Sequence, residues 1–503
     1  MDPVLCNAIL TLTARFIPQL IEYHRGAQEA SEYYANLIRS TLLLEADNPT
    51  LERVQALLML SLHEWGSLRG GRAWIYVGLA LQMGFLLRII RRQGRKNLDD
   101  RIPGTPEEFL QSECRIRSFW ACSMMADFIS SGCDRVRLVH EERVSIPLPV
   151  SEERFLWCLV DDQTRMSAED SEKGHLIKIV ELWSEISRWV CGHKREEEQS
   201  PPWSEDSTFF RLRQALSDWA VALPPKHRYN ASMFNAHAIA GYAASYGFMH
   251  LVYCTAVIFL HREYIQVLPD RSKPYWDRDG EKWGPPPDAA FWKKSLLDLF
   301  GASKRATDIL NKLWSLGASV LTPFVGFSAF TASGMNIYLA ILPWMCPELS
   351  VDARTYAEQT VNYLKNIMKI WPIAEKWYKS VLKLYNTYRL YVTEGVAPAS
   401  PEGDVLDTFE HLDSSFLNYG EFAICPNDSG LSKGPQPTNG LLANSTDATG
   451  PVLQVSASRN ETDLGEFADE SLDPTHDSLE AILSQIFRDE FGDGTDIASF
   501  WPS

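Results

Sequence analysis

Paired cysteines are missing from this 503-residue sequence, although it contains nine cysteines in all. No two of them lie closer than eight residues, so the chain has no Cys-x-x-Cys unit of the kind that directs several thiolates at one zinc ion. An odd, dispersed set is typical of reduced thiols in the nucleus or cytosol rather than of a disulfide framework. We therefore expect neither zinc nor another cofactor in this chain.

Excess positive charge is missing as well, because 48 lysines and arginines stand against 65 acidic residues. The stretch 396–503 holds 20 acidic and 3 basic residues, which leaves 45 of each sign before it. A neutral body without a basic N-terminal arm lacks the cationic surface that binding to phosphates needs. DNA contact by this chain alone is therefore not expected.

A signal peptide and an uninterrupted membrane span are also missing. Asp2 stands where a secretory signal would have a cationic start. The stretch 313–347 carries no charge and is long enough to span a bilayer, but Pro323, Gly326 and Gly334 interrupt it. We interpret it as an internal helix of a large α-helical core and predict no membrane partner.

Helical periodicity dominates the first 395 residues, and no alternating strand pattern or fixed repeat is visible. The sequence therefore predicts an all-α body over residues 1–395, followed by a disordered acidic tail over 396–503. The predicted helices are 4–17, 27–45, 50–65, 72–90, 106–132, 171–191, 207–222, 234–266, 289–316, 324–342, 351–370 and 374–393.

The tail is rich in Ser, Asp, Gly, Pro, Asn and Thr, which cannot bury enough apolar surface to offset the entropy of ordering. Two segments within it, 405–422 and 479–501, interleave apolar and acidic residues, a composition typical of activation segments that bind coactivator or Mediator-type proteins. A solubilising tail with incidental apolar residues is the alternative. The candidate contact residues of the second segment are Leu479, Ile482, Leu483, Ile486, Phe487, Phe491, Phe500 and Trp501.

Two neighbouring helical segments of the body carry distinctive patterns. In the first, one helical face carries Trp74, Val77, Gly78 and Leu81. This pattern predicts a packing face where the glycine leaves a hole for a neighbouring helix. In the second, Arg115 and Arg117 lie about 200° apart around the helix axis. At least one of the two guanidinium groups should therefore find a partner inside the fold.

The order of these patterns resembles the regulatory (middle homology) domain of fungal binuclear zinc-cluster transcription factors of the xylanolytic-activator type. The resemblance is closest over residues 51–155 and extends more loosely from residue 1 to about 393. The family usually has Arg after the Asp of the motif, where this chain has Phe128. The motif residues that carry the resemblance are Arg72, Trp74, Tyr76, Gly78, Arg115, Arg117, Phe119, Trp120 and Asp127.

The resemblance implies a non-enzymatic regulator of RNA polymerase II transcription in the nucleus, whose helical domain restrains or exposes the tail in response to an effector or a modification. In this family, zinc and DNA binding belong to an element N-terminal to the regulatory domain, and its motif is absent here. Because residues 1–18 already fit a helix of the domain, we expect either a naturally finger-less form or a sequence that lacks its first segment. Such a chain would reach DNA through the missing segment or a partner, for instance by dimerising with a related factor.

A small-molecule-binding or terpenoid-type all-α enzyme is the alternative from another class. Asp161 and Asp162 begin a pattern similar to the magnesium site of terpenoid synthases, but Arg165 would repel the cations. His250 and Cys254 have a spacing that suits metal ligands, although the apolar residues around them favour a buried pair without metal. The sixteen tryptophans fit two interpretations, an apolar effector cavity or a filled core. No catalytic or metal-binding residue is predicted.

Overall fold

The computed structural model describes residues 2–87, 105–131, 138, 146–159, 171–266, 269, 280–288, 290–318 and 322–394. Within these ranges every regular element is a helix and no strand occurs. The predicted all-α class is therefore confirmed for the described part of the body. The acidic tail and both candidate activation segments lie outside the described residues.

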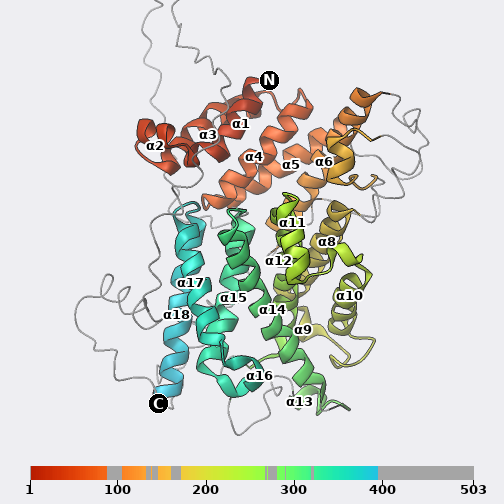
Figure 1. Ribbon diagram of the computed structural model, residues 1–503, viewed down its shortest axis with the longest axis vertical. Coiled ribbons are helices and arrows are strands. Elements are labelled where there is room, and N and C mark those ends of the chain that lie inside the picture. The colour runs from red at the N-terminus through yellow and green to blue at the C-terminus, as the bar shows by residue number, and fades with distance from the viewer. Residues whose placement is uncertain are drawn as a thin grey trace, which may run out of the picture. The chain divides into compact units, whose positions relative to one another are not determined.

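Six helices make up the N-terminal part of the body (Figure 1): α1 (Pro3–Thr13), α2 (Pro18–His24), α3 (Ala27–Leu44), α4 (Leu51–Gly66), α5 (Gly70–Leu86) and α6 (Pro106–Ile129). Local sequence signals set several of their starts, since the side chains of Asp2, Thr50 and Thr105 accept hydrogen bonds from backbone N–H groups in the first turns of α1, α4 and α6. Helix α4 packs against α1, α5 and α6.

Seven longer helices make up the rest of the body: α8 (Glu172–Cys191), α10 (Thr208–Ala222), α12 (Ala243–His261), α14 (Ala290–Ser315), α15 (Pro323–Ile341), α17 (Ala353–Met368) and α18 (Ile373–Glu394). Shorter helices connect them: α7 (Glu152–Leu156), α9 (Lys194–Glu197), α11 (Ala231–Ile239), α13 (Gly280–Trp283) and α16 (Pro347–Ser350). Helix α12 packs against α8, α14 and α15, and α15 packs against α14, α17 and α18.

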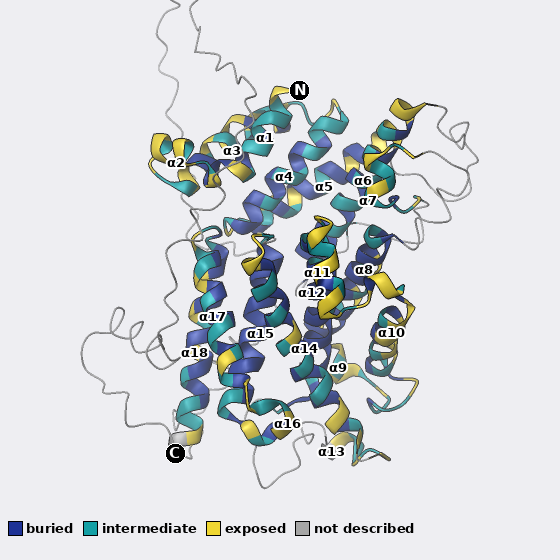
Figure 2. Ribbon diagram, in the orientation of Figure 1, coloured by how far each residue is buried: buried dark blue, intermediate teal, exposed yellow. Residues whose placement is uncertain are grey.

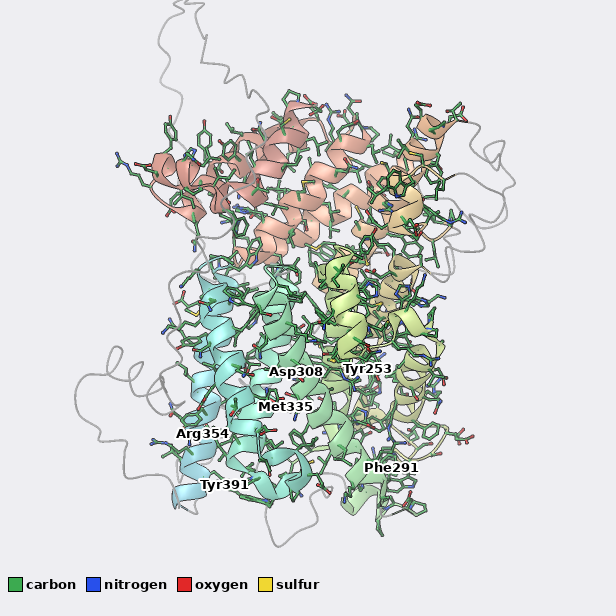
Figure 3. The ribbon with its side chains drawn as sticks, viewed as in Figure 1. Tyr253, Phe291, Asp308, Met335, Arg354 and Tyr391 are labelled. Carbon is green, nitrogen blue, oxygen red and sulfur yellow. The ribbon has the colours of Figure 1, made fainter. Side chains whose placement is uncertain are left out.

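The core of this second group lies along α12 and α15, whose ribbons are almost entirely in the buried colour in Figure 2. Aromatic rings fill the space around them, as Trp183 meets Phe259 and Phe324 edge to face with ring centroids 5.0 and 5.5 Å apart. Met335, labelled on α15 in Figure 3, is also buried. Across the body, seven of the fourteen tryptophans that the structure describes are buried, which favours the filled-core interpretation.

In the described part of the chain, two helical stretches are long and apolar enough to cross a membrane, Ala243–Tyr264 and α15. The bent pair Pro3–Phe16 and Pro18–His24 passes the same test only when the two helices are taken together. In α15, 89% of the most apolar window is buried within the protein itself. The prediction that the uncharged stretch 313–347 contains an internal helix is therefore confirmed.

The predicted helix 234–266 is wrong as a single element. The chain breaks between α11 and α12, where Gly241 has a φ of +80°. Glycine adopts this left-handed conformation at little cost, whereas a helix cannot continue through it. Apolar residues continue across the break, so the hydrophobic pattern alone did not reveal it.

One close contact joins the N-terminal helices to the corner between α17 and α18. Trp371, which lies in that corner, is 2% exposed and packs against Gly66 at the end of α4. The guanidinium of Arg15 lies 4.1 Å from the centre of the Trp371 ring and donates a hydrogen bond of 2.8 Å to the carbonyl of Ile370. Residues more than 300 positions apart in the sequence therefore hold this junction together.

Candidate functional site

The motif helix α6 is organised around Arg117, whose guanidinium makes three different contacts. Its Nε donates to Glu113 Oε1 at 2.9 Å, its Nη1 to Glu152 Oε2 at 2.8 Å, and its Nη2 to the carbonyl of Val150 at 3.1 Å. The Phe155 ring lies 4.0 Å from the same guanidinium. The prediction that one motif arginine has a partner inside the fold is confirmed.

The carboxylate of Glu113 completes this arrangement, because it also accepts a 3.0 Å hydrogen bond from the backbone N–H of Val150. Burial raises the pKa of Glu113, and the hydrogen bond from Arg117 opposes that shift. Partial burial also acts to raise the pKa of Glu152, but the hydrogen bond from Arg117 and the charge of Lys173 bring it below its ordinary value. Arg117 and Glu113 together fasten the segment after residue 146 to α6.

Other motif residues stabilise the same region. Trp120 Nε1 donates to the carbonyl of Pro147 at 3.0 Å, and Phe119 is buried. Ser184 of α8 donates a 2.8 Å hydrogen bond to the buried carboxylate of Asp127. Tyr76 is buried within α5, whereas Arg72 and Arg115 are exposed. Most of the motif residues therefore hold helices together, whereas Arg72 and Arg115 are exposed to solvent.

The predicted packing role of Gly78 is wrong. A Cβ added at this glycine would have no heavy atom within 4 Å, so none of the described helices lies against it. Of the predicted packing face, Val77 and Leu81 are buried, whereas Trp74 and Gly78 are half-buried. The buried residues of this helix are Gly70, Ala73, Tyr76, Val77, Ala80, Leu81, Met83 and Gly84.

A second cluster of charges, which the sequence did not reveal, lies between α3 and α4. Arg39 donates to Glu32 at 2.6 Å and to Glu64 at 2.7 Å, and Arg69 pairs with the same two carboxylates. The Glu64 side chain is fully buried, so its two arginine partners offset the cost of its desolvation. The helical i,i+3 and i,i+4 neighbours of Glu64 gave no sign of this pairing, because Arg39 lies 25 residues away and Arg69 lies beyond the end of α4.

His63 links this charge cluster to Arg15. Arg15 donates to Nδ1 of His63 at 2.9 Å, which requires His63 to be the neutral tautomer that donates from Nε2 to Glu32, also at 2.9 Å. Burial lowers the pKa of His63, which agrees with a neutral ring. Burial acts to raise the pKa of Glu32, but the hydrogen bonds with His63 and Arg39 bring it far below its ordinary value. The cluster is thus a continuous charged network that reaches the α17–α18 corner through Arg15.

The histidines and the cysteine of α12 are core residues with protein partners. His250 shares a 2.9 Å hydrogen bond with the carbonyl of His227, and His261 shares one of 2.7 Å with Ser295. Burial lowers the pKa of each ring to about 3 and raises the pKa of the Cys254 thiol to about 12. Across the described residues, no group of three or more His, Cys, Asp or Glu side chains could hold a metal ion.

Several residues singled out from the sequence lie outside the described ranges. These are Asp161, Asp162 and Arg165 of the magnesium-site pattern and the eight candidate contact residues of segment 479–501. The seven cysteines that the structure describes are all free thiols.

Comparison with known proteins finds a family model that matches the N-terminal region. The fungal specific transcription factor domain matches residues 1–220, which include both motif helices and both charge clusters. The chain is 28% identical over 426 residues to an uncharacterized transcriptional regulatory protein of Schizosaccharomyces pombe, a match that covers 78% of this chain and 60% of the relative. No solved structure matches this chain.

Two further relatives carry similar names. A second uncharacterized transcriptional regulatory protein of Schizosaccharomyces pombe is 30% identical over 52% of this chain and 28% of its own length. The Zn(2)-C6 fungal-type transcription factor FTF1a of Fusarium oxysporum f. sp. lycopersici is 25% identical over 84% of this chain and 39% of its own length. The chain thus spans less than two thirds of each of these relatives. All three names describe transcription regulators, and none describes an enzyme, so the terpenoid-type alternative has no support.

Proposed function

We propose that this chain, which carries a fungal specific transcription factor domain over residues 1–220, is the regulatory and activating part of a nuclear regulator of RNA polymerase II transcription. Its helical body has no enzymatic role and controls how the acidic tail meets the transcription machinery. The observation that carries the proposal is the domain match together with relatives that are named as transcription regulators.

The tail supplies activation in this proposal. Segment 479–501 places apolar and aromatic side chains among acidic ones, which keeps them solvated and available to an apolar groove on a coactivator or Mediator-type protein. Segment 405–422 has the same character. The regulatory body would restrain or expose these segments when an effector or a modification changes its stability.

A reporter assay tests the activating role. The tail 396–503, fused to an unrelated DNA-binding domain, should activate a reporter, and replacing Ile486, Phe487 and Phe491 with Ala should abolish the signal. A matched control replaces Leu441, Leu442 and Val452, three apolar residues outside both segments, and should leave activation unchanged. Unchanged activation after the first set of substitutions would contradict the assignment of the second segment.

DNA and zinc binding enter the proposal by way of the relatives, because this sequence carries no zinc-cluster motif. FTF1a is named as a Zn(2)-C6 transcription factor, and this chain matches 39% of its length. The body carries no net positive charge, so we propose that DNA is reached through an additional zinc-binding segment or through dimerisation with a related factor. The purified 503-residue chain should not shift promoter DNA in a gel, and a specific shift would refute this division of roles.

A further inference from the structure

The outer face of the α17–α18 hairpin carries five exposed lysines, which we call the lysine face: Lys365, Lys369, Lys376, Lys379 and Lys383. The three on α18 follow one another at intervals of three and four residues, so they form one stripe along the helix. Lys365 lies in the last turn of α17 and Lys369 directly follows this helix, near the corner that joins the two helices.

This face points away from the buried side of both helices. On α18 the buried residues Ala374, Trp377, Tyr378 and Val381 fill the opposite side. Glu375 pairs with Lys379 at 2.8 Å, but both side chains are more than half exposed, so this pair is weak. Residues 365–383 hold five lysines and one acidic residue, so this part of the hairpin carries an excess of positive charge although the body as a whole is neutral.

The chain that follows α18 is strongly acidic. Ten residues separate the end of α18 from segment 405–422. This segment contains four acidic residues among its apolar ones and has neither lysine nor arginine. Opposite charge favours this segment over a second copy of the neutral body as the occupant of the lysine face.

The linker is long enough for the segment to fold back. Eleven steps of extended chain from Glu394 to Val405 reach up to about 36 Å. The helix axis from Glu394 back to Lys376 covers about 27 Å. A contact within one chain also benefits from an effective concentration on the order of millimolar.

We propose that segment 405–422 docks on the lysine face of α17 and α18, with its carboxylates on the lysines and its apolar residues against the lysine stems. This inference rests on the proposed function, because it assigns a docking surface to one of the two proposed activation segments. It places segment 405–422 on α18, the helix that follows the contact between Trp371 and Gly66 of α4.

Zero-length carbodiimide cross-linking of the full chain tests the contact, because it joins lysine amines to carboxylates only where they touch. Cross-linked peptides between α18 and segment 405–422 are expected, and mixing isotopically labelled with unlabelled chains separates links within one chain from links between two. Links found only between chains would overturn the docking within one chain. The yield should fall at high salt, since the screening length shrinks from about 10 Å at 0.1 M to about 3 Å at 1 M.

Charge reversal provides the decisive comparison. The reversed variant carries K376E, K379E and K383E. Its yield of links between the other lysines of the face and the segment should fall about eightfold, because three surface pairs each contribute roughly a factor of two. Adding D407K, E410K and D413K should restore links between the new acidic residues and the new lysines.

Two controls keep the outcome clear. A matched variant with K226E, K293E and K294E removes three exposed lysines from other helices and should keep the original yield. The proposal would be overturned if the wild-type chain formed no cross-link to the segment and bound duplex DNA, while the reversed variant did not bind DNA. The lysine face would then be a nucleic-acid surface. The cross-linking experiment does not measure transcription, so a missing cross-link would contradict the docking and leave the proposed transcriptional role untouched. A tail that forms the cross-links but fails to activate the reporter would contradict only the transcriptional role.

Discussion

The contact between Gly66 and Trp371 makes a sharp prediction about stability. A Cβ added at Gly66 would lie 1.9 Å from Cε3 of the Trp371 ring and 2.4 Å from Cζ3. Atoms cannot approach that closely, so Gly66→Ala must push a buried tryptophan ring out of its place. The Arg15 guanidinium that stacks on the ring would lose its partner as well.

The expected cost follows from these contacts. Overpacking a core costs about 1–3 kcal/mol, and full loss of a buried tryptophan costs about 3–5 kcal/mol. The loss of the cation–π contact adds about 0.5–1 kcal/mol, whereas the helix propensity of alanine returns less than about 1 kcal/mol at the last residue of a helix. Gly66→Ala should therefore lower the free energy of unfolding by about 2–4 kcal/mol.

Gly78 provides the matched control, because it lies in the neighbouring helix α5 and a Cβ there would have no heavy atom within 4 Å. Gly78→Ala should raise the free energy of unfolding by about 1 kcal/mol through helix propensity alone. Urea denaturation of both variants, followed by circular dichroism, measures the two effects. Equal stability of the wild type and Gly66→Ala, or a loss in Gly78→Ala as large as in Gly66→Ala, would refute the reasoning.

Three further predictions use the same denaturation assay. Arg117→Met should lower the free energy of unfolding by about 3–5 kcal/mol, because it leaves the carboxylate of Glu113 buried without a guanidinium partner. Arg117→Lys should recover only part of that loss. A loss smaller than that of an average surface substitution would contradict the role of Arg117. Because the folded-state pKa of Glu32 is lowered, its contribution to stability is present above the ordinary glutamate value of 4.5 and is lost as pH falls further. Glu32→Gln should therefore flatten the decline of stability below about pH 4.5, and a decline as steep as in the wild type would count against this carboxylate. Gly241→Ala should lower the free energy of unfolding by about 1–2 kcal/mol, because a left-handed φ of +80° is strained for alanine. An unchanged midpoint of urea denaturation would contradict this prediction.

Much of the fold was predictable because helices form from local signals. The apolar period, the threonine and serine caps, and the prolines at helix starts lie within a few residues of the elements they define. For example, the predicted helix 106–132 differs from α6 only at its C-terminal end. The helix α2 was missed because it is short and follows a bend after Phe16, where no longer periodic pattern can develop.

The candidate site was predictable only in part. The sequence indicated that a motif arginine needs a partner inside the fold, and Arg117 has one, but which carboxylate it meets depends on how the segment after residue 146 returns to α6. The role of Gly78 was misjudged because glycine looks the same whether a neighbouring helix or open space lies beside it.

By itself, the sequence determined the helical class of the body, the division between neutral body and acidic tail, and the motif that resembles fungal regulatory domains, because each of these is written in residues close together along the chain. Only the tertiary structure decided which face of α5 is buried, how Glu32, Glu64 and three arginines meet, and that Trp371 closes on Gly66. These contacts join segments far apart in the sequence, and their energies depend on distances that no local pattern specifies.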